Sequence, residues 1–161
     1  MDLGKPLAKW PMTLNNGRYR DQWHTMTRTG RAPALNAHEP EPYVDMHAAD
    51  LAAAGLVSGE IAKVVSRWGV AMARVRSSGE MPPGMVFMPI HWSEQNSRGS
   101  RVGAVVNPVV DPLSGEPEFK HTPVRIARWH AHWRGYLLSR IQVTDLPVVS
   151  GSGCTVTTAD G

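Results

Sequence analysis

The side chains best suited to gripping an anion lie between Gly17 and Arg31. This segment has four arginines against a single acid, Asp21, together with three threonine hydroxyls. Arginine can bind phosphate oxygens in a bidentate manner, and glycine lets the backbone approach them closely. Trp23 and His24 offer a ring face and a hydrogen-bond donor to a heterocycle. The segment therefore predicts binding of an anion or a nucleotide, with a solvated basic loop as the simpler alternative.

Other motifs for cofactor or covalent chemistry are weak. The sequence has no Gly-x-x-x-x-Gly-Lys-[Ser/Thr] phosphate loop, and 151–153 lacks the third glycine of a dinucleotide fingerprint. A single cysteine, Cys154, excludes an intrachain disulfide, and its Gly/Ser/Thr surroundings do not favour a reactive thiol. His130 and His132 would share one side of a strand, but no third ligand is near them in the sequence. We therefore assign no catalytic residue and no metal ligand to this chain.

Composition limits the classes of partner. The chain has 161 residues, 42% hydrophobic and 19% charged, which fits one globular domain with or without a loose tail. A net charge of +3 is compatible with a bound polyphosphate and too small to predict a nucleic-acid partner. No apolar run approaches the ~20 residues of a membrane span, and the N-terminus lacks the apolar core of a signal peptide. We expect no membrane partner.

Short apolar runs separated by frequent turns predict a mainly β fold with small helices. Alternating and β-branched residues predict strands, and Ala-rich residues 47–55, ended by Gly55, predict a short helix. Residues 15–17 are expected to turn, and 32–42, with three prolines, to form an extended loop. The expected strands are 10–14, 43–46, 60–66, 70–76, 85–90 and 122–127. The hairpin at 60–76 and the strands at 85–90 and 122–127 would form the wall of a nearly or fully closed β-barrel that binds through its loops.

Four stretches, in the same order along the chain, resemble the C-terminal molybdopterin dinucleotide-binding domain of the DMSO-reductase superfamily. The wording of residues 21–31 is similar to that of assimilatory nitrate reductase catalytic subunits. The resemblance covers roughly residues 10–128. Its four stretches are 15–31, 41–47, 84–92 and 107–120, the last running from Asn107-Pro108 through Asp111-Pro112-Leu113-Ser114-Gly115 to Glu118-Phe119-Lys120.

The resemblance implies a double-psi β-barrel that binds Mo-bis(molybdopterin guanine dinucleotide). It places a first cofactor loop at the end of the first strand, with Arg28 as a neighbour, a second contact at 91–92 and a third at Lys120. The usual asparagine after Arg-Val in the middle loop is Gly103 here, and Asn96 or Asn107 could compensate. The implied cofactor-binding residues are Asn16, Gly17, Arg18, Gln22, Trp23, His24, Thr25, Arg28, His91, Trp92 and Lys120.

The resemblance also implies a division of the chain and a set of partners. Residues 1–9 would be an N-terminal extension, 10–128 the dinucleotide-binding barrel, and 129–161 a partly disordered C-terminal extension. Enzymes of this family are longer, and their remaining domains carry an iron–sulfur cluster and the ligand to molybdenum. We therefore expect a fragment that is inactive alone, whose partners are those remaining domains and an electron-donor protein or domain, in the cytoplasm.

Two alternatives remain open. The same domain could come from another molybdopterin oxidoreductase, such as a formate dehydrogenase or a periplasmic nitrate reductase. A standalone double-psi barrel could instead serve as an interaction module without cofactor, because a fold does not fix a function. Convergence of residues 16–31, 91–92 and Lys120 on one polar cleft would favour the cofactor, and their separation would favour the interaction module.

Overall fold

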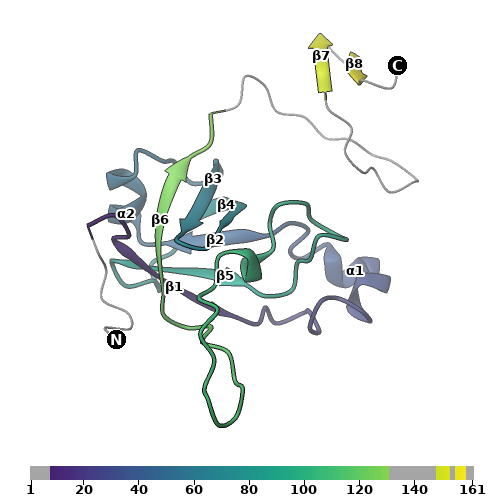
Figure 1. Ribbon diagram of the computed structural model, residues 1–161. Coiled ribbons are helices and arrows are strands. Elements are labelled where there is room, and N and C mark those ends of the chain that lie inside the picture. Colours follow the sequence, from purple (N-terminus) through teal and green to yellow (C-terminus); the bar gives the residue numbers. More distant parts are fainter. Residues whose placement is uncertain (1–7, 131–147, 153–154, 159–161) are drawn as a thin grey trace. The chain divides into compact units, whose positions relative to one another are not determined.

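A computed structural model of the 161-residue chain describes residues 8–130, 148–152 and 155–158 (Figure 1). It contains two compact units, Met1–His130 and Ala131–Gly161. The second unit has two strands, β7 (Val148–Ser152) and β8 (Thr155–Thr158), which pair antiparallel. These strands lie within the segment that we expected to be partly disordered. The possible strand that would hold His130 and His132 lies almost wholly outside the described residues.

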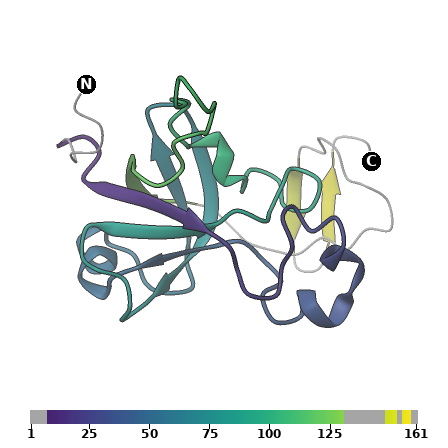
Figure 2. The same ribbon diagram turned by 90° about the horizontal axis from the view of Figure 1, so that it is seen from below.

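The first unit is a closed β-barrel with strand order β1-β5-β2-β4-β3-β6, which confirms the predicted double-psi β-barrel (Figures 1 and 2). Two parallel pairs, β1 with β5 and β2 with β4, are joined through antiparallel pairs into the closed sheet. The strands are β1 (Met12–Gly17), β2 (Tyr43–Met46), β3 (Ile61–Ser66), β4 (Val70–Ser77), β5 (Met85–Pro89) and β6 (Thr122–Arg128).

Alternation of side chains fills the barrel. In β4, Ala71, Ala73 and Val75 are buried while Met72 and the arginines of the same strand face outward, as the sequence pattern predicted. The fully buried side chains with the largest volumes include Leu14, Met46, Met88, Val44, Val64, Val75, Val86 and Val124. Their burial supplies the main free energy that keeps the barrel closed.

Short helices connect the strands. The predicted helix is α2 (Ala48–Ala53), where the His47 side chain accepts a hydrogen bond from the Ala49 amide, and Gly55 follows with φ +66°. A 3₁₀ turn, η2 (Val102–Ala104), precedes β6. None of the described helices is long and apolar enough to cross a membrane.

Two local predictions were wrong. Residues 15–17 extend β1 rather than turning, because Asn15, Asn16 and Gly17 pair in register with Phe87, Met88 and Pro89 of β5. Strand pairing here overrides a turn-forming composition. Within residues 32–42, where we expected extended loop, the chain forms a short helix, α1 (Pro33–Asn36), which follows a 3₁₀ helix, η1 (Thr29–Arg31). Pro33 stands at the start of α1, the one helical position that a proline favours.

The barrel topology brings three distant segments to one end. Since β1 and β5 run parallel and end together at Gly17 and Pro89, the segments that follow them leave from the same end of the barrel. The antiparallel pairing of β6 with β1 carries the residues just before Thr122 to that end as well. The fold therefore gathers residues 16–31, 90–103 and 119–120, which are far apart in the sequence.

Candidate functional site

A cleft of about 400 Å³ opens at this end of the barrel. It takes residues from the end of β1 and its following loop, from the segment after β5, from η2, and from the lead into β6. Its lining residues are Asn16, Gly17, Arg18, Thr25, Ile90, Trp92, Ser93, Arg101, Val102, Gly103, Phe119 and Lys120.

Three cationic side chains line this cleft, whose surface is otherwise mainly apolar. Arg18, Arg101 and Lys120 line it, and no carboxylate stands among the described residues that form its wall. The Lys120 ammonium donates a hydrogen bond to the backbone carbonyl of Asn16, which joins the lead into β6 to the end of β1. In the described part of the chain, Arg18 and Arg101 are exposed and form no ion pair with another side chain. Two guanidinium groups are thus available to a ligand rich in phosphate oxygens.

One residue of the cleft lining, Asn16, has a buried polar atom without a hydrogen-bond partner. Asn16 is only 2% exposed, lines the cleft, and its Nδ2 has no hydrogen-bond partner among the described residues. An unsatisfied buried amide costs free energy, and such a group in a native structure calls for an explanation. A ligand with an acceptor atom at the floor of the cleft would satisfy it.

Two glycines shape the cleft in different ways. A Cβ at Gly17 would stand 3.1 Å from Cε2 of the Phe87 ring, so glycine keeps the backbone close to β5 here. A Cβ at Gly103 would meet only Cγ of Arg101, at 3.9 Å. A Cβ at position 103 would therefore have room. Neither Asn96 nor Asn107 is among the residues that line the cleft.

η2 is held against the barrel by a close approach at the β3–β4 turn. A Cβ at Gly69 would lie 2.2 Å from the Ala104 carbonyl oxygen, which no side chain could tolerate. This turn and η2 therefore pack backbone to backbone. The contact fixes the segment from which Arg101 and Gly103 reach the cleft.

The loop that follows β1 is held together by its own buried amide. Gln22 donates from Nε2 to Asn36 Oδ1 at 2.9 Å and accepts at Oε1 from the Thr29 hydroxyl at 2.5 Å. Thr29 Oγ1 in turn accepts a hydrogen bond from the Trp23 amide at 3.3 Å. We predicted that Gln22 contacts a cofactor, but its side-chain amide forms hydrogen bonds with Asn36 and Thr29 instead.

The base of the same loop is anchored by His91, which is fully buried. His91 Nε2 accepts a hydrogen bond from the Tyr19 amide at 2.7 Å, and Nδ1 lies 2.5 Å from the His24 carbonyl oxygen. Both ring nitrogens are therefore engaged by backbone groups of the loop. We predicted His91 as a cofactor contact, and the structure places it behind the loop, outside the cleft lining.

One carboxyl group sits at the outer side of this loop. Arg20 binds both carboxylate oxygens of Asp21, at 2.9 and 3.1 Å, and His38 Nδ1 lies 2.8 Å from Oδ2 of the same carboxylate. Arg20 first, and His38 second, hold the pKa of Asp21 well below its usual range. The negative charge of the one acid in the predicted anion-binding segment is thus balanced by Arg20, and this acid is not among the residues that line the cleft.

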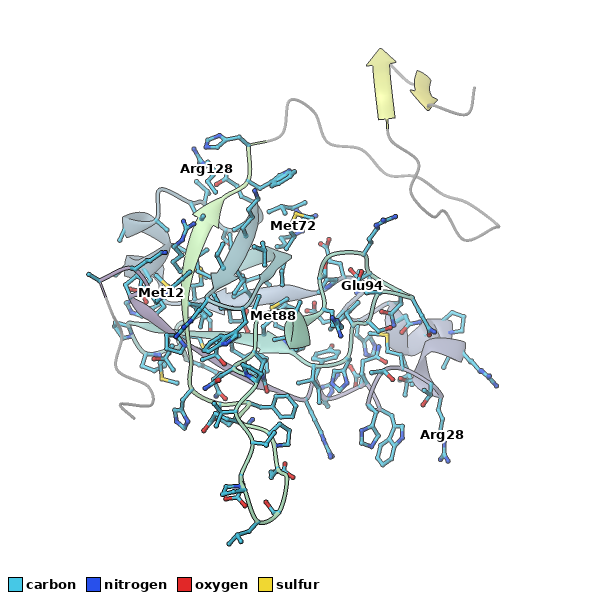
Figure 3. The ribbon with its side chains drawn as sticks, viewed as in Figure 1. Met12, Arg28, Met72, Met88, Glu94 and Arg128 are labelled. Carbon is cyan, nitrogen blue, oxygen red and sulfur yellow. The ribbon has the colours of Figure 1, made fainter. Side chains whose placement is uncertain are left out.

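The predicted site residues fall into two groups. The cleft gathers residues from all three predicted contact regions: Asn16, Gly17, Arg18, Thr25, Trp92 and Lys120. The others lie outside its lining: Gln22, Trp23, His24, Arg28 and His91. Trp23 is 48% exposed with its ring edge-on to His24, and Figure 3 shows Arg28 at the outer edge of the loop.

Sequence reasoning missed Arg101 and Phe119. Arg101 lies in the middle loop whose altered residue, Gly103, was noticed, so the signal was an arginine two positions before it. Phe119 directly precedes Lys120 and covers the same wall of the cleft. The apolar residues Ile90 and Val102 complete the wall, and only the closed barrel shows that they reach it.

Comparison with known proteins gives the same class of domain. The sequence matches the family described as the Molydopterin dinucleotide binding domain over residues 12–123. The chain belongs to this family. The match begins at the first residue of β1 and ends inside β6, so it spans β1 to β5 and the start of β6.

Curated relatives of this chain include nitrate reductases. A nitrate reductase of Klebsiella oxytoca is 47% identical over 140 residues, which are 87% of this chain and 16% of the relative. A nitrate reductase of Shewanella frigidimarina is 35% identical over 134 residues, 71% of this chain and 14% of the relative. The chain thus spans about a sixth of the length of these relatives.

A solved structure shows the same fold at lower identity. Acetylene hydratase from Pelobacter acetylenicus superposes with a TM-score of 0.64 and 19% sequence identity, over 74% of this chain and 18% of that protein. This likeness concerns the barrel and carries no statement about the reaction.

Proposed function

We propose that this chain is the dinucleotide-binding part of the catalytic subunit of a molybdenum nitrate reductase, which reduces nitrate to nitrite. The observation that carries the proposal is the cleft, which is lined by Arg18, Arg101 and Lys120 and by Asn16, whose buried Nδ2 has no partner among the described residues. Residues from the three predicted contact regions line this one cleft, which favours a cofactor-binding domain over an interaction module without cofactor. The nitrate reductases among its relatives support the substrate.

The residues present fit a molybdopterin guanine dinucleotide. Arg18 and Arg101 would bind its phosphate oxygens through charge-assisted hydrogen bonds, and Lys120 would add a third positive charge. Asn16 Nδ2 would donate to an acceptor atom on the floor of the cleft. Thr25, with its hydroxyl, and Trp92, with its ring, would complete the polar and apolar walls. When bound, the cofactor supplies the molybdenum-based oxygen-atom transfer, and the protein binds and orients it.

The finer assignments belong to the same proposal. The enzyme would act in nitrate assimilation in the cytoplasm, with residues 10–128 as the cofactor-binding domain. The remaining domains of the catalytic subunit would supply the iron–sulfur cluster and the ligand to molybdenum, and an electron-donor protein or domain would deliver electrons. This chain alone would not reduce nitrate. Recombinant chain that reduced nitrate with a viologen donor, without another polypeptide, would overturn that assignment.

The test is the cofactor content of the full-length enzyme. Arg18→Ala removes one of the guanidinium groups at the cleft, and a hydrogen bond to a charged group contributes about 1.5–3 kcal/mol. We expect molybdenum and guanine nucleotide per polypeptide to fall together in Arg18→Ala. Turnover per bound molybdenum should stay nearly constant, because Arg18 binds the cofactor and takes no part in the reaction.

The matched control is Arg67→Ala, which removes an exposed arginine at the β3–β4 turn, outside the cleft lining. Its cofactor content should equal that of the unaltered enzyme. Full molybdenum content in Arg18→Ala with lost activity would reject the assignment of Arg18, and equal losses in both variants would reject the cleft as the binding site.

A further inference from the structure

The histidine behind the cleft has its hydrogen bonds fixed by the backbone. His91 is 0% exposed, and both of its partners are main-chain groups of residues 18–31. The Tyr19 amide can only donate, so His91 Nε2 must accept and carries no proton. The His24 carbonyl can only accept, so Nδ1 must carry the proton. The arrangement requires a neutral ring protonated at Nδ1.

The backbone that His91 holds is strained. His24 has φ +44° and Met26 has φ +62°, and they are the two residues other than glycine with positive φ in the described chain. L-residues enter this region rarely and at a cost in free energy, which the surroundings must offset. Thr25, between them, is the residue of this part of the loop that lines the cleft. The strained pair thus sets where Thr25 stands.

Further contacts hold the second strained residue. The Met26 amide donates to the Trp23 carbonyl at 2.9 Å, and Asn96 Nδ2 lies 3.4 Å from Met26 Sδ. The Met26 side chain is 9% exposed, so packing as well as hydrogen bonding fixes it. His24 has an exposed side chain, and His91 is the side chain whose hydrogen bond reaches its backbone.

We propose that His91 is a positioning residue that keeps the loop in its strained conformation, with the neutral ring protonated at Nδ1 bridging Tyr19 and His24. It acts through the loop rather than by touching a ligand. The identity of the ligand in the cleft comes from the proposed function, whereas the His91 bridge does not depend on that ligand. The bridge itself is tested on the free 161-residue chain, so its failure and that of cofactor binding are distinguishable.

The first test reads the ring directly. Long-range proton–nitrogen NMR spectra of the chain at neutral pH should show His91 as a neutral ring with the proton on Nδ1. The exposed His38 and His121 serve as internal references, since no backbone pair fixes their tautomer. A charged His91 ring, or a proton on Nε2, would overturn the proposal without any variant.

The second test separates the two hydrogen bonds. His91→Asn offers a donor near the former Nδ1, and His91→Gln offers an acceptor near the former Nε2, whereas His91→Phe removes both. Hydrogen exchange of the Tyr19 amide should be about tenfold faster in His91→Asn and His91→Phe, and close to normal in His91→Gln. Equal exchange in all three variants would contradict the proposed bridge, because a space-filling role alone does not distinguish them.

The third test asks whether His91 acts against strain at His24. Glycine adopts positive φ without penalty, so His24→Gly should restore part of the loop protection lost in His91→Phe. Thr27→Gly, in the same loop but without positive φ, is the matched control and should restore none. Equal effects of the two glycines would overturn the claim that His91 holds the strained backbone.

Discussion

Two long loops flank the cleft, and they keep their shapes in opposite ways. Residues 18–31 depend on side chains elsewhere: Gln22 reaches Asn36, and His91 holds the backbone from behind. The arm, residues 107–120, depends on hydrogen bonds within itself, made by its main chain and by the Asp111 side chain. Figure 1 shows it projecting from the barrel between η2 and β6.

Within the arm, Asp111 organises the tip. Its Oδ1 accepts hydrogen bonds from the Leu113 amide at 3.0 Å and from the Ser114 amide at 2.8 Å, and its amide donates to the Glu116 carbonyl at 2.9 Å. Leu113, at the tip, is 97% exposed. A turn held by residues close in the sequence does not depend on the rest of the fold, whereas the strained loop at 18–31 requires the closed barrel around it.

The comparison predicts that substitutions in residues 18–31 destabilise the whole barrel, whereas substitutions in the arm affect only the arm. Gln22→Ala removes both hydrogen bonds of a buried amide and leaves Asn36 Oδ1 without its donor. We expect this substitution to lower the free energy of unfolding by about 1–3 kcal/mol. Denaturant unfolding of the chain measures the change.

Gln95→Ala is the control for that prediction, since it alters an exposed glutamine in the neighbouring segment after β5. It should leave the midpoint of unfolding within the error of the measurement. If Gln22→Ala unfolds at the same denaturant concentration as Gln95→Ala, the buried amide does not hold the loop, and the contrast with the arm disappears.

Asp111→Ala should have a smaller effect, confined to the arm. Exchange of the Leu113 and Ser114 amides should become about fivefold faster, while the amides of the barrel strands keep their protection. Faster exchange throughout the barrel would show that the arm and the barrel are one cooperative unit, contrary to the comparison.

The same carboxyl predicts a pH dependence. The Ser114 amide and hydroxyl, followed by the Leu113 amide, hold the pKa of Asp111 below its ordinary value of 3.8. A lowered pKa in the folded state means that the stabilisation is fully present above pH 3.8 and is lost as the pH falls through the folded-state pKa. Asp111→Asn, which keeps an acceptor oxygen but does not titrate, should lack this dependence of the exchange of the Leu113 and Ser114 amides.

Elements whose structure depends on nearby residues could be predicted from the sequence, and elements whose structure depends on distant strands could not. The alternation in 70–76 and the Ala-rich helix ended by Gly55 are local patterns, and the structure shows them as β4 and α2. The three predicted contact regions came from the resemblance, and the cleft takes residues from each of them. The strand character of Asn15 and Asn16 depends on pairing with β5, which composition does not reveal. Pairing with a strand distant in the sequence therefore determined the conformation of these two residues.

The division among the predicted site residues has the same cause. A resemblance identifies which loop is concerned, but it does not say which side of the loop faces the ligand. Arg18 and Thr25 face the cleft, whereas Gln22 and His91 hold the loop from its other side. Arg101 reaches the cleft because Gly69 lets η2 pack closely on the hairpin turn. These directions follow from packing across the barrel.

The most direct test of the central claim is the footprint of the cofactor on the full-length enzyme. Hydrogen exchange would be compared between enzyme loaded with cofactor and enzyme made in cells that cannot complete the dinucleotide. We predict slower exchange on loading at residues 16–18, 25, 92, 101–103 and 119–120, with residues 111–115 at the arm's tip nearly unchanged. Unchanged exchange around the cleft, with protection elsewhere in the barrel, would contradict the assignment of this cleft to the cofactor.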